Sequence, residues 1–175
     1  MTAWLTGLSG SGKSTIASEC ERLLLEAGHL SFVLDGDNLR HGLNSGLGFD
    51  ADGRREAVRR AGEAALLVAE AGAVAIVGMI SPYRAGRDLV RARHASMGVP
   101  FIEVHVDAPI EVAERRDPKG LYARARAGEI RGFTGIDDPY EPPAAPELVL
   151  RSAELSPGDC AASLVRCVVA ACRGG

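Results

Sequence analysis

The residues with the clearest chemical signature lie close to the start of the chain. Residues 7–14 read Gly-Leu-Ser-Gly-Ser-Gly-Lys-Ser, which fits the phosphate-binding pattern G-x-x-x-x-G-K-[ST]. Glycines let backbone N–H groups turn inward around a chain of phosphates, and a following helix adds the positive end of its dipole. Lys13 is expected to project from an exposed loop toward the phosphates, and Ser14 to offer its hydroxyl to magnesium. The predicted nucleotide contacts are Gly7, Ser9, Gly10, Ser11, Gly12, Lys13, Ser14 and Thr15.

Two carboxylates form the second group of candidate residues. Asp35 and Asp37 follow residues 31–34, a short apolar run typical of a strand. In an open α/β sheet, residues just beyond a strand's carboxyl end face the ligand crevice, so Asp35 is expected to orient magnesium or accept a proton from a hydroxyl nucleophile. The alternative is a turn that caps the next helix, with Asn38 as the cap. For Asp37 both interpretations stay open. The apolar run at 73–77 ends without a carboxylate, which favours Asp35 and water as magnesium ligands.

The elements around these residues predict how they are positioned. Residues 3–6 predict a buried strand before the glycine loop, and residues 15–25 predict a helix after it. Further strands are predicted at 31–34, 73–77, 101–106 and 148–150. Further helices are predicted at 54–71, 84–97, 107–115 and 122–126, and from residue 157. This alternation predicts a three-layer α/β fold with a mostly parallel five-stranded sheet.

Two polar segments are expected to form the mobile parts of the site. Residues 39–53 are rich in glycine and predict a long loop, and such loops in compact domains are often binding loops. Residues 127–136 are punctuated by glycine and predict a lid, within a lid region of about residues 117–137. The proline-rich residues 137–146 then predict an irregular connector to the last strand.

Length and composition bound the remaining possibilities. The 175 residues are 46% apolar and 25% charged with a net charge of −3, which predicts one domain over residues 1–175 and gives no reason to expect a nucleic-acid or membrane partner. Cys20, Cys160, Cys167 and Cys172 contain no C-x-x-C pair, so reduced thiols in a cytoplasmic protein are expected. The first predicted strand leaves no room for a signal peptide, and no apolar run is long enough to span a bilayer.

Beyond these single features, residues 4–150 resemble the adenylyl-sulfate kinases, a family that phosphorylates the 3′-hydroxyl of adenosine 5′-phosphosulfate. The glycine loop alone would indicate only a nucleotide binder. The resemblance also rests on Leu34-Asp-Gly-Asp-Asn38, Arg40-His-Gly-Leu-Asn44, Leu47-Gly-Phe49, Ile80-Ser-Pro-Tyr-Arg84, Arg116-Asp-Pro-Lys-Gly-Leu-Tyr122 and Ala125–Asp137. The last three motifs are specific to this family.

The resemblance implies a P-loop nucleoside-phosphate-kinase fold and roles for the matching positions. Asp35 is implied at the reacting hydroxyl and near Mg2+, Lys13 and Lys119 complete the implied catalytic group, and Arg116 is implied on the ATP side. Lys119 is expected under the closing lid, near the phosphates.

For the acceptor, the resemblance implies that Arg40 and Arg54 hold the anionic end and that Phe49 and Phe133 stack on the base. The full set of implied acceptor contacts is Asp37, Arg40, Asn44, Phe49, Arg54, Ile80, Ser81, Lys119, Phe133 and Thr134.

Several positions depart from the family pattern. Ala57 stands where family members usually have an asparagine that contacts the acceptor's anionic group, and Ser45 and Gly46 replace a basic residue and an aspartate. Gly53 stands in place of an aspartate, and Met79 replaces an aromatic or alanine-rich stretch. These departures concern the acceptor's identity more than the reaction.

The resemblance predicts transfer of the ATP γ-phosphoryl group to the 3′-hydroxyl of adenosine 5′-phosphosulfate, with Mg2+ as cofactor. A related kinase for another nucleotide 5′-conjugate, such as cytidine diphosphoramidate, is the first alternative. A nucleotide-dependent switch or binding module is the second, although an Asn-Lys-x-Asp base-reading motif is missing from the sequence. Family members are commonly dimers, so a homodimer is considered.

Overall fold

Strands and helices alternate along residues 1–173, the part of the chain that the computed structural model describes. The elements are β1 (Thr2–Thr6), α1 (Lys13–Glu26), β2 (Ser31–Asp35), α2 (Gly36–Arg40), α3 (Ala51–Glu70), β3 (Val74–Gly78), α4 (Arg84–Ser96), β4 (Phe101–Asp107), α5 (Ile110–Arg116), α6 (Leu121–Arg126), β5 (Leu148–Arg151) and α7 (Pro157–Arg173). No helix in the described range is long and apolar enough to cross a bilayer. The single domain predicted over residues 1–175 includes residues 174–175, which lie outside that range.

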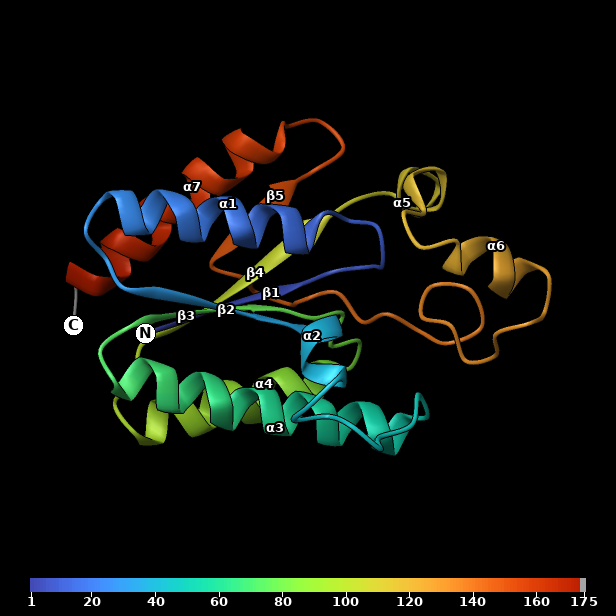
Figure 1. The fold of residues 1–175 in the computed structure, drawn as a ribbon, viewed down its shortest axis with the longest axis horizontal. Coiled ribbons are helices and arrows are strands. Elements are labelled where there is room, and N and C mark those ends of the chain that lie inside the picture. The colour runs from blue at the N-terminus through green and yellow to red at the C-terminus, as the bar shows by residue number, and fades with distance from the viewer. Residues whose placement is uncertain (174–175) are drawn as a thin grey trace.

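The five strands form one sheet in the order β2-β3-β1-β4-β5, and every neighbouring pair is parallel. Figure 1 shows α1 and α7 on one face of the sheet and α3 and α4 on the other, which gives the predicted three layers. Because all strands run in the same direction, their carboxyl ends meet at one edge. Helices α5 and α6 lie beyond that edge (Figure 1).

Two apolar clusters pack on the two faces of this sheet. All five residues of β1 are buried, because this strand lies in the middle of the sheet. Side chains alternate between the faces of a strand, so Ala3 and Leu5 pack with α1 and α7, whereas Trp4 packs with α3 and α4. A third, smaller cluster lies beyond the sheet and includes Tyr122 and Phe133. The core thus anchors the loop that leaves β1.

Several element boundaries differ from the sequence-based prediction, and two of them lie beside the site. Helix α3 begins at Ala51 instead of residue 54, because the Asp50 carboxylate caps it by accepting a hydrogen bond from the Gly53 N–H at 2.7 Å. The predicted loop of residues 39–53 is also shortened at its start by α2. The cap of α2 is Asp35, which corrects the interpretation of Asn38 as the capping residue.

Candidate active site

The phosphate-binding loop connects β1 to α1 at the carboxyl edge of the sheet. Gly10 has a left-handed backbone with φ 73°, and a Cβ there would lie 2.6 Å from the Ala113 carbonyl oxygen. A Cβ at Gly7 would lie 2.5 Å from the Val106 carbonyl oxygen. Only glycine fits both positions, so the loop is shaped by close approach of the backbone of β4 and α5.

Lys13 is placed differently from the exposed position that its motif predicts. It is the first residue of α1 and is only 8% exposed. Its Nζ donates hydrogen bonds to the carbonyl oxygens of Gly7 at 2.9 Å and Leu8 at 2.7 Å. Burial lowers the pKa of Lys13 to about 8, although Asp35 and Asp37 favour its charged form. The ammonium therefore lies folded against the loop.

The two oxygens of Asp35 contact different partners. The Ser14 hydroxyl donates to Oδ2 at 2.6 Å, which joins the end of β2 to the start of α1. Oδ1 accepts hydrogen bonds from the N–H groups of Asp37 at 2.9 Å and Asn38 at 3.4 Å. The same side chain thus caps α2 and faces the phosphate-binding loop. Its role at magnesium or at a reacting hydroxyl stays a prediction.

A single cavity of about 1070 Å³ gathers most of the predicted site. It is lined by the phosphate-binding loop, the start of α2, the loop after β3 and the lid. The predicted site residues that line it are Ser9, Gly10, Ser11, Gly12, Lys13, Ser14, Thr15, Asp35, Asp37, Arg40, Phe49, Arg54, Ile80, Ser81, Arg116, Lys119, Phe133 and Thr134. Ala57 also lines it, at the position that departs from the family pattern.

Two predicted contacts do not line this cavity. Gly7 lies behind the loop, where its carbonyl accepts from Lys13. Asn44 is 1% exposed, and neither its amide nitrogen nor its amide oxygen has a hydrogen-bond partner within residues 1–173. The predicted acceptor contact of Asn44 therefore stays a prediction that the cavity lining does not include.

Aromatic rings line the cavity from two separate segments. Phe49, in the loop before α3, is 69% exposed, and the Arg40 guanidinium lies 4.2 Å from its ring centroid. Phe133, in the lid, packs edge-to-face on Tyr122 with the ring centroids 5.0 Å apart. Tyr122 in turn donates to the Ser9 carbonyl oxygen at 3.0 Å. The lid aromatic is thereby tied to the phosphate-binding loop.

The lid (residues 117–137) is held across the cavity at both of its ends. At its start, the Lys119 ammonium pairs with the Asp37 carboxylate, and both side chains are at least half exposed. The predicted position of Lys119 close to the phosphate-binding site is consistent with its place in the cavity lining.

Arg54 holds the far end of the lid. It donates to the Gly132 carbonyl and the Thr134 hydroxyl, and its Nη1 lies 3.1 Å from an oxygen of Asp138. The Tyr83 hydroxyl donates to the same carboxylate at 3.1 Å. The sequence motifs implied Arg54 for the acceptor's anionic end, and the lid contacts of this arginine were not predicted from them.

On the donor side of the cavity, the predicted Arg116 is accompanied by residues after β5 that no motif indicated. Arg116 donates to the Ser152 carbonyl oxygen at 2.6 Å, and thereby links α5 to the segment after β5. The cavity continues there along Ser152, Leu155, Pro157 and Cys160. The only signal for these residues is their position just beyond a strand's carboxyl end, where ligands bind in open α/β sheets.

The residues present fit a magnesium ion that is bound mainly by substrate. Among residues 1–173, no group of three or more His, Cys, Asp or Glu side chains is placed to hold a metal. The Ser14 hydroxyl and the Asp35 carboxylate supply two adjacent oxygen atoms. Mg2+ takes oxygen ligands and usually retains several from water and phosphate, so a sparse protein site is sufficient.

Three features define the class of P-loop kinases. They are a glycine loop at the start of a helix, a carboxylate that is hydrogen-bonded to the serine of that loop, and a lid over one cavity. Within that class, the chain belongs to the adenylylsulphate kinase family, whose model matches residues 1–151. This finding confirms the family and the α/β fold predicted from the sequence.

Individual relatives agree with this assignment. The adenylyl-sulfate kinase of Saccharomyces bayanus is 53% identical over 168 residues, which are 96% of this chain and 83% of that protein. The chloroplastic adenylyl-sulfate kinase 4 of Arabidopsis thaliana is 56% identical over 149 residues, 85% of this chain and 47% of that protein. The APS kinase CysC of Mycobacterium tuberculosis, solved in complex with AMPPNP and APS, has a TM-score of 0.93 and 51% identity, and the match covers 95% of this chain and 96% of that one.

Proposed function

We propose that the chain transfers the γ-phosphoryl group of ATP to the ribose 3′-hydroxyl of adenosine 5′-phosphosulfate. A bond forms between the 3′-oxygen and the γ-phosphorus while the bond from that phosphorus to the bridging oxygen of ADP breaks. The products are 3′-phosphoadenosine 5′-phosphosulfate and ADP, and the hydroxyl proton leaves the 3′-oxygen. The observation that carries the proposal is the 2.6 Å contact between Ser14 and Asp35, inside a cavity that is also lined by Phe49 and Phe133.

On the donor side, backbone N–H groups of residues 9–15 hold the phosphates at the start of α1. Lys13 supplies a positive charge there once it exchanges the loop carbonyls for phosphate oxygens. Arg116 borders the ATP side and fixes the segment after β5. Such catalysis depends on positioning and electrostatic stabilisation more than on covalent chemistry of the protein.

Asp35 is the residue for the reacting hydroxyl. Its carboxylate is within hydrogen-bonding distance of the phosphate-binding loop, and it is able to orient the 3′-hydroxyl and accept its proton. Ser14 and Asp35 would hold Mg2+, which neutralises charge on the ATP phosphates when it is bound. Lys119 lines the same cavity from the lid, and from there it would reach the phosphates.

On the acceptor side, Phe49 and Phe133 would offer faces for the base, and Arg40 and Arg54 would hold the anionic end. Asp37 lines the same cavity. Ile80, Ser81 and Thr134 line the remaining wall of the cavity. Arg54 acts through the lid as well, because its guanidinium binds Gly132 and Thr134. Closure of this lid excludes water, which protects ATP from hydrolysis.

The deciding experiment is an acceptor panel with purified protein and Mg-ATP. ADP release and product mass are measured with adenosine 5′-phosphosulfate, cytidine diphosphoramidate, other adenosine and cytidine 5′-conjugates, and no acceptor. We expect rapid turnover only with adenosine 5′-phosphosulfate and a product that gains one phosphate. Preference for a cytidine conjugate would assign the related kinase activity, and slow hydrolysis that ignores every acceptor would indicate a switch.

Two properties of the whole protein complete the proposal. We propose a homodimer, in keeping with the resemblance, and sedimentation at several concentrations tests it. We also propose the cytoplasm as the compartment, because the four cysteines are free thiols. The chloroplastic relative shows that the family is not confined to that compartment, so fractionation of the source cells is the direct test.

A further inference from the structure

The loop after β3 holds a serine in a conformation that residues with side chains rarely adopt. Ser81 has φ 40°, which lies in the left-handed region that favours glycine. It is buried, it lines the cavity, and its Oγ accepts a hydrogen bond from the Trp4 indole N–H at 3.0 Å. Backbone strain of this kind persists only where the surroundings over-determine it, and it concentrates at ligand sites.

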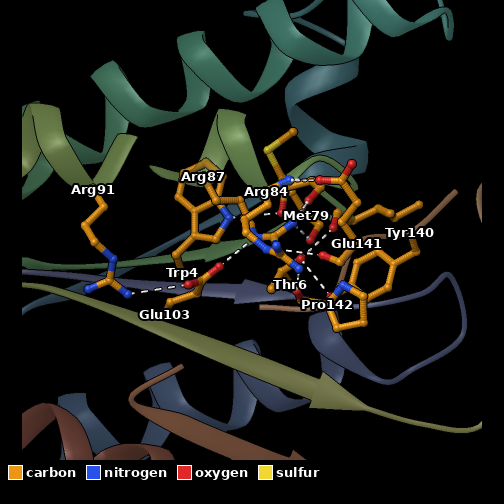
Figure 2. Close-up of polar contacts among 12 residues, drawn as sticks. Trp4, Thr6, Met79, Arg84, Arg87, Arg91, Glu103, Tyr140, Glu141 and Pro142 are labelled. Carbon is orange, nitrogen blue, oxygen red and sulfur yellow. Dashed lines mark hydrogen bonds and ion pairs between the residues drawn. The ribbon is translucent and has the colours of Figure 1, made fainter. Parts of the chain in front are cut away.

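Arg87 of α4 binds the backbone of this loop from inside the protein. Its side chain has no exposed surface. Its three nitrogens donate to three different segments: to the Ser81 carbonyl at 2.7 Å, to the Glu141 carbonyl at 2.7 Å and to the Glu103 carboxylate at 2.6 Å. Figure 2 shows Arg87 and Glu141 close together, with Glu103 paired to the same guanidinium.

The Glu141 contact connects Arg87 to the lid. Glu141 belongs to the connector that follows the lid, and its N–H donates to the Pro82 carbonyl at 2.9 Å. Its carboxylate accepts from the Arg84 N–H at 2.7 Å, so connector and loop lie against each other (Figure 2). Asp138, three residues before Glu141, binds Arg54 at the far end of the lid. The buried guanidinium of Arg87 therefore contacts both the cavity wall, at Ser81, and the connector that follows the lid, at Glu141.

We propose that Arg87 is a positioning residue for the acceptor. It holds Ser81 in its left-handed conformation and, through Glu141, fixes the end of the lid, so that the cavity wall and the lid keep one relative placement. The proposal rests on the proposed function, because it takes residues 80–82 as part of the acceptor subsite. The donor subsite at residues 9–15 has no contact with Arg87.

The chemistry of the side chain explains why arginine is needed here. A guanidinium is planar and directs donors along several fixed directions, whereas a lysine ammonium is a compact point charge that lacks this fork. Glu103 provides the opposite charge that a buried cation requires. A buried ion pair is weak evidence for stability, because its desolvation costs about as much as the attraction gains. The positioning of Ser81 and Glu141 is therefore a better explanation for the Arg87–Glu103 pair than a gain in stability.

The test compares Arg87→Lys with a matched variant on the same helix, Arg91→Lys. Arg91 lies one turn further along α4 and pairs with Glu147 at 2.6 Å and with Glu103 at 3.5 Å, but it touches neither Ser81 nor Glu141. If Arg87→Lys folds poorly, the double variant Arg87→Met, Glu103→Gln is used instead. It removes both buried charges and therefore leaves no unpaired ion. Michaelis constants are measured for both substrates, and hydrogen exchange is measured for the peptides 79–84 and 138–142 in the protein without ligands.

For Arg87→Lys and the double variant, we expect the Michaelis constant for the acceptor to rise about tenfold or more, as for a lost hydrogen bond to a charged group. The constant for ATP should change by less than about twofold, and both peptides should exchange faster than in Arg91→Lys. Equal rises for the two substrates, or constants and exchange that match Arg91→Lys, would overturn the proposal. If the wild-type protein does not use adenosine 5′-phosphosulfate, the proposed function fails, and the exchange measurement still decides whether Arg87 positions the two segments.

Discussion

Asp35 gives the sharpest test among single residues, because its two oxygens have separable tasks. In Asp35→Asn the amide oxygen still caps α2, since asparagine is as good a cap as aspartate. The amide nitrogen that replaces the oxygen near Ser14 cannot accept the proton of the acceptor's 3′-hydroxyl. We expect ATP binding within a few-fold of wild type and a turnover number lower by about two to four orders of magnitude.

Asp50→Asn is the matched control, because Asp50 caps α3 in the same manner and does not line the cavity. Calorimetric ATP titration and initial rates are measured for both variants. The role of Asp35 is refuted by an Asp35→Asn protein that binds ATP and turns over as fast as Asp50→Asn.

Ala57 tests how far the acceptor subsite departs from the family pattern. It is 1% exposed and lines the cavity one helical turn after Arg54. An amide at this position would add a donor for the acceptor's anionic end. Because a hydrogen bond to a charged group contributes about 1.5–3 kcal/mol, we expect Ala57→Asn to lower the Michaelis constant for adenosine 5′-phosphosulfate by about tenfold.

The control for Ala57→Asn is Ala57→Leu, which adds a similar volume without a donor. A tighter constant in the asparagine variant alone supports the hydrogen bond. Loss of activity in both variants would mean that the native acceptor fills the space beside Ala57. If neither variant changes any constant across the acceptor panel, Ala57 plays no part in acceptor binding.

Among the elements, the lid is held unequally at its two ends. The Lys119–Asp37 pair is largely exposed, and exposed pairs contribute about 0.2–1 kcal/mol. The Arg54–Asp138 pair is mostly buried, with side chains that are 11% and 22% exposed, and Tyr83 adds a hydrogen bond to it. We expect Asp138→Ala to open the lid at least about tenfold more often, and Asp37→Ala to open it less than about fivefold more often.

Limited digestion with trypsin measures this difference, because Arg124, Arg126 and Arg131 lie in the lid. When opening is fast, the cleavage rate follows the population of the open form. Equal cleavage rates for the two variants would contradict the unequal anchoring. Faster cleavage outside the lid would instead reveal global unfolding, which a thermal melt excludes independently.

The sequence predicts elements well where their signals are local. The run around β1 and the glycine loop are fixed by burial on both faces and by close backbone approach at Gly7 and Gly10. The predicted start of α3 is three residues late, because the helical pattern alone does not reveal the Asp50 cap. The contacts of Arg54 with the lid join residues about 80 positions apart, and no periodicity or spacing predicts such a pairing.

The site residues were predicted to a similar extent as the elements. The contacts that were not predicted again depend on how the folded chain packs, which a local motif does not specify. Residues inside contiguous motifs line the cavity together. Lys13 lies folded onto the carbonyls of its own loop, which the motif does not specify. Asn44 is buried and does not line the cavity, and the donor-side residues after β5 belong to no motif. Arg87 could not be distinguished by sequence from the other arginines of α4.

For the molecule as a whole, one buried and one partly buried histidine make stability depend on pH. His94 is fully buried: its Nδ1 donates to the Val90 carbonyl at 2.9 Å, and its Nε2 accepts from the Thr2 hydroxyl at 3.0 Å. Burial lowers the pKa of His94 below its ordinary 6.5, and burial likewise lowers the pKa of His105. As the pH falls below about 6.5, the unfolded chain takes up protons that the folded chain does not, so stability decreases toward lower pH.

Urea unfolding between pH 7.5 and pH 5 measures this effect. Each histidine contributes at most about 1.4 kcal/mol per pH unit. We expect His94→Gln to reduce the slope of unfolding free energy against pH by part of that amount, with the exposed His41→Gln as control. An unchanged slope in His94→Gln would show that other groups dominate the acid sensitivity.

The packing of α7 against α1 has a consequence for how the protein is made. Ile16, Cys20 and Leu24 of α1 share one apolar cluster with Cys160 and Leu164 of α7, which follows the other described elements in the chain. The central strand β1 also cannot pair until later strands have been made, because it pairs with β3 and β4 and not with β2, the next strand in the sequence. Such non-local pairing is slow, and it leaves apolar surface uncovered on a nascent chain. The phosphate-binding loop is translated well before α7, so the helix that presents it stays uncovered until α7 has been made. We therefore expect a chain that ends at Arg151, where the family match stops, to aggregate and to show no thermal stabilisation by ATP.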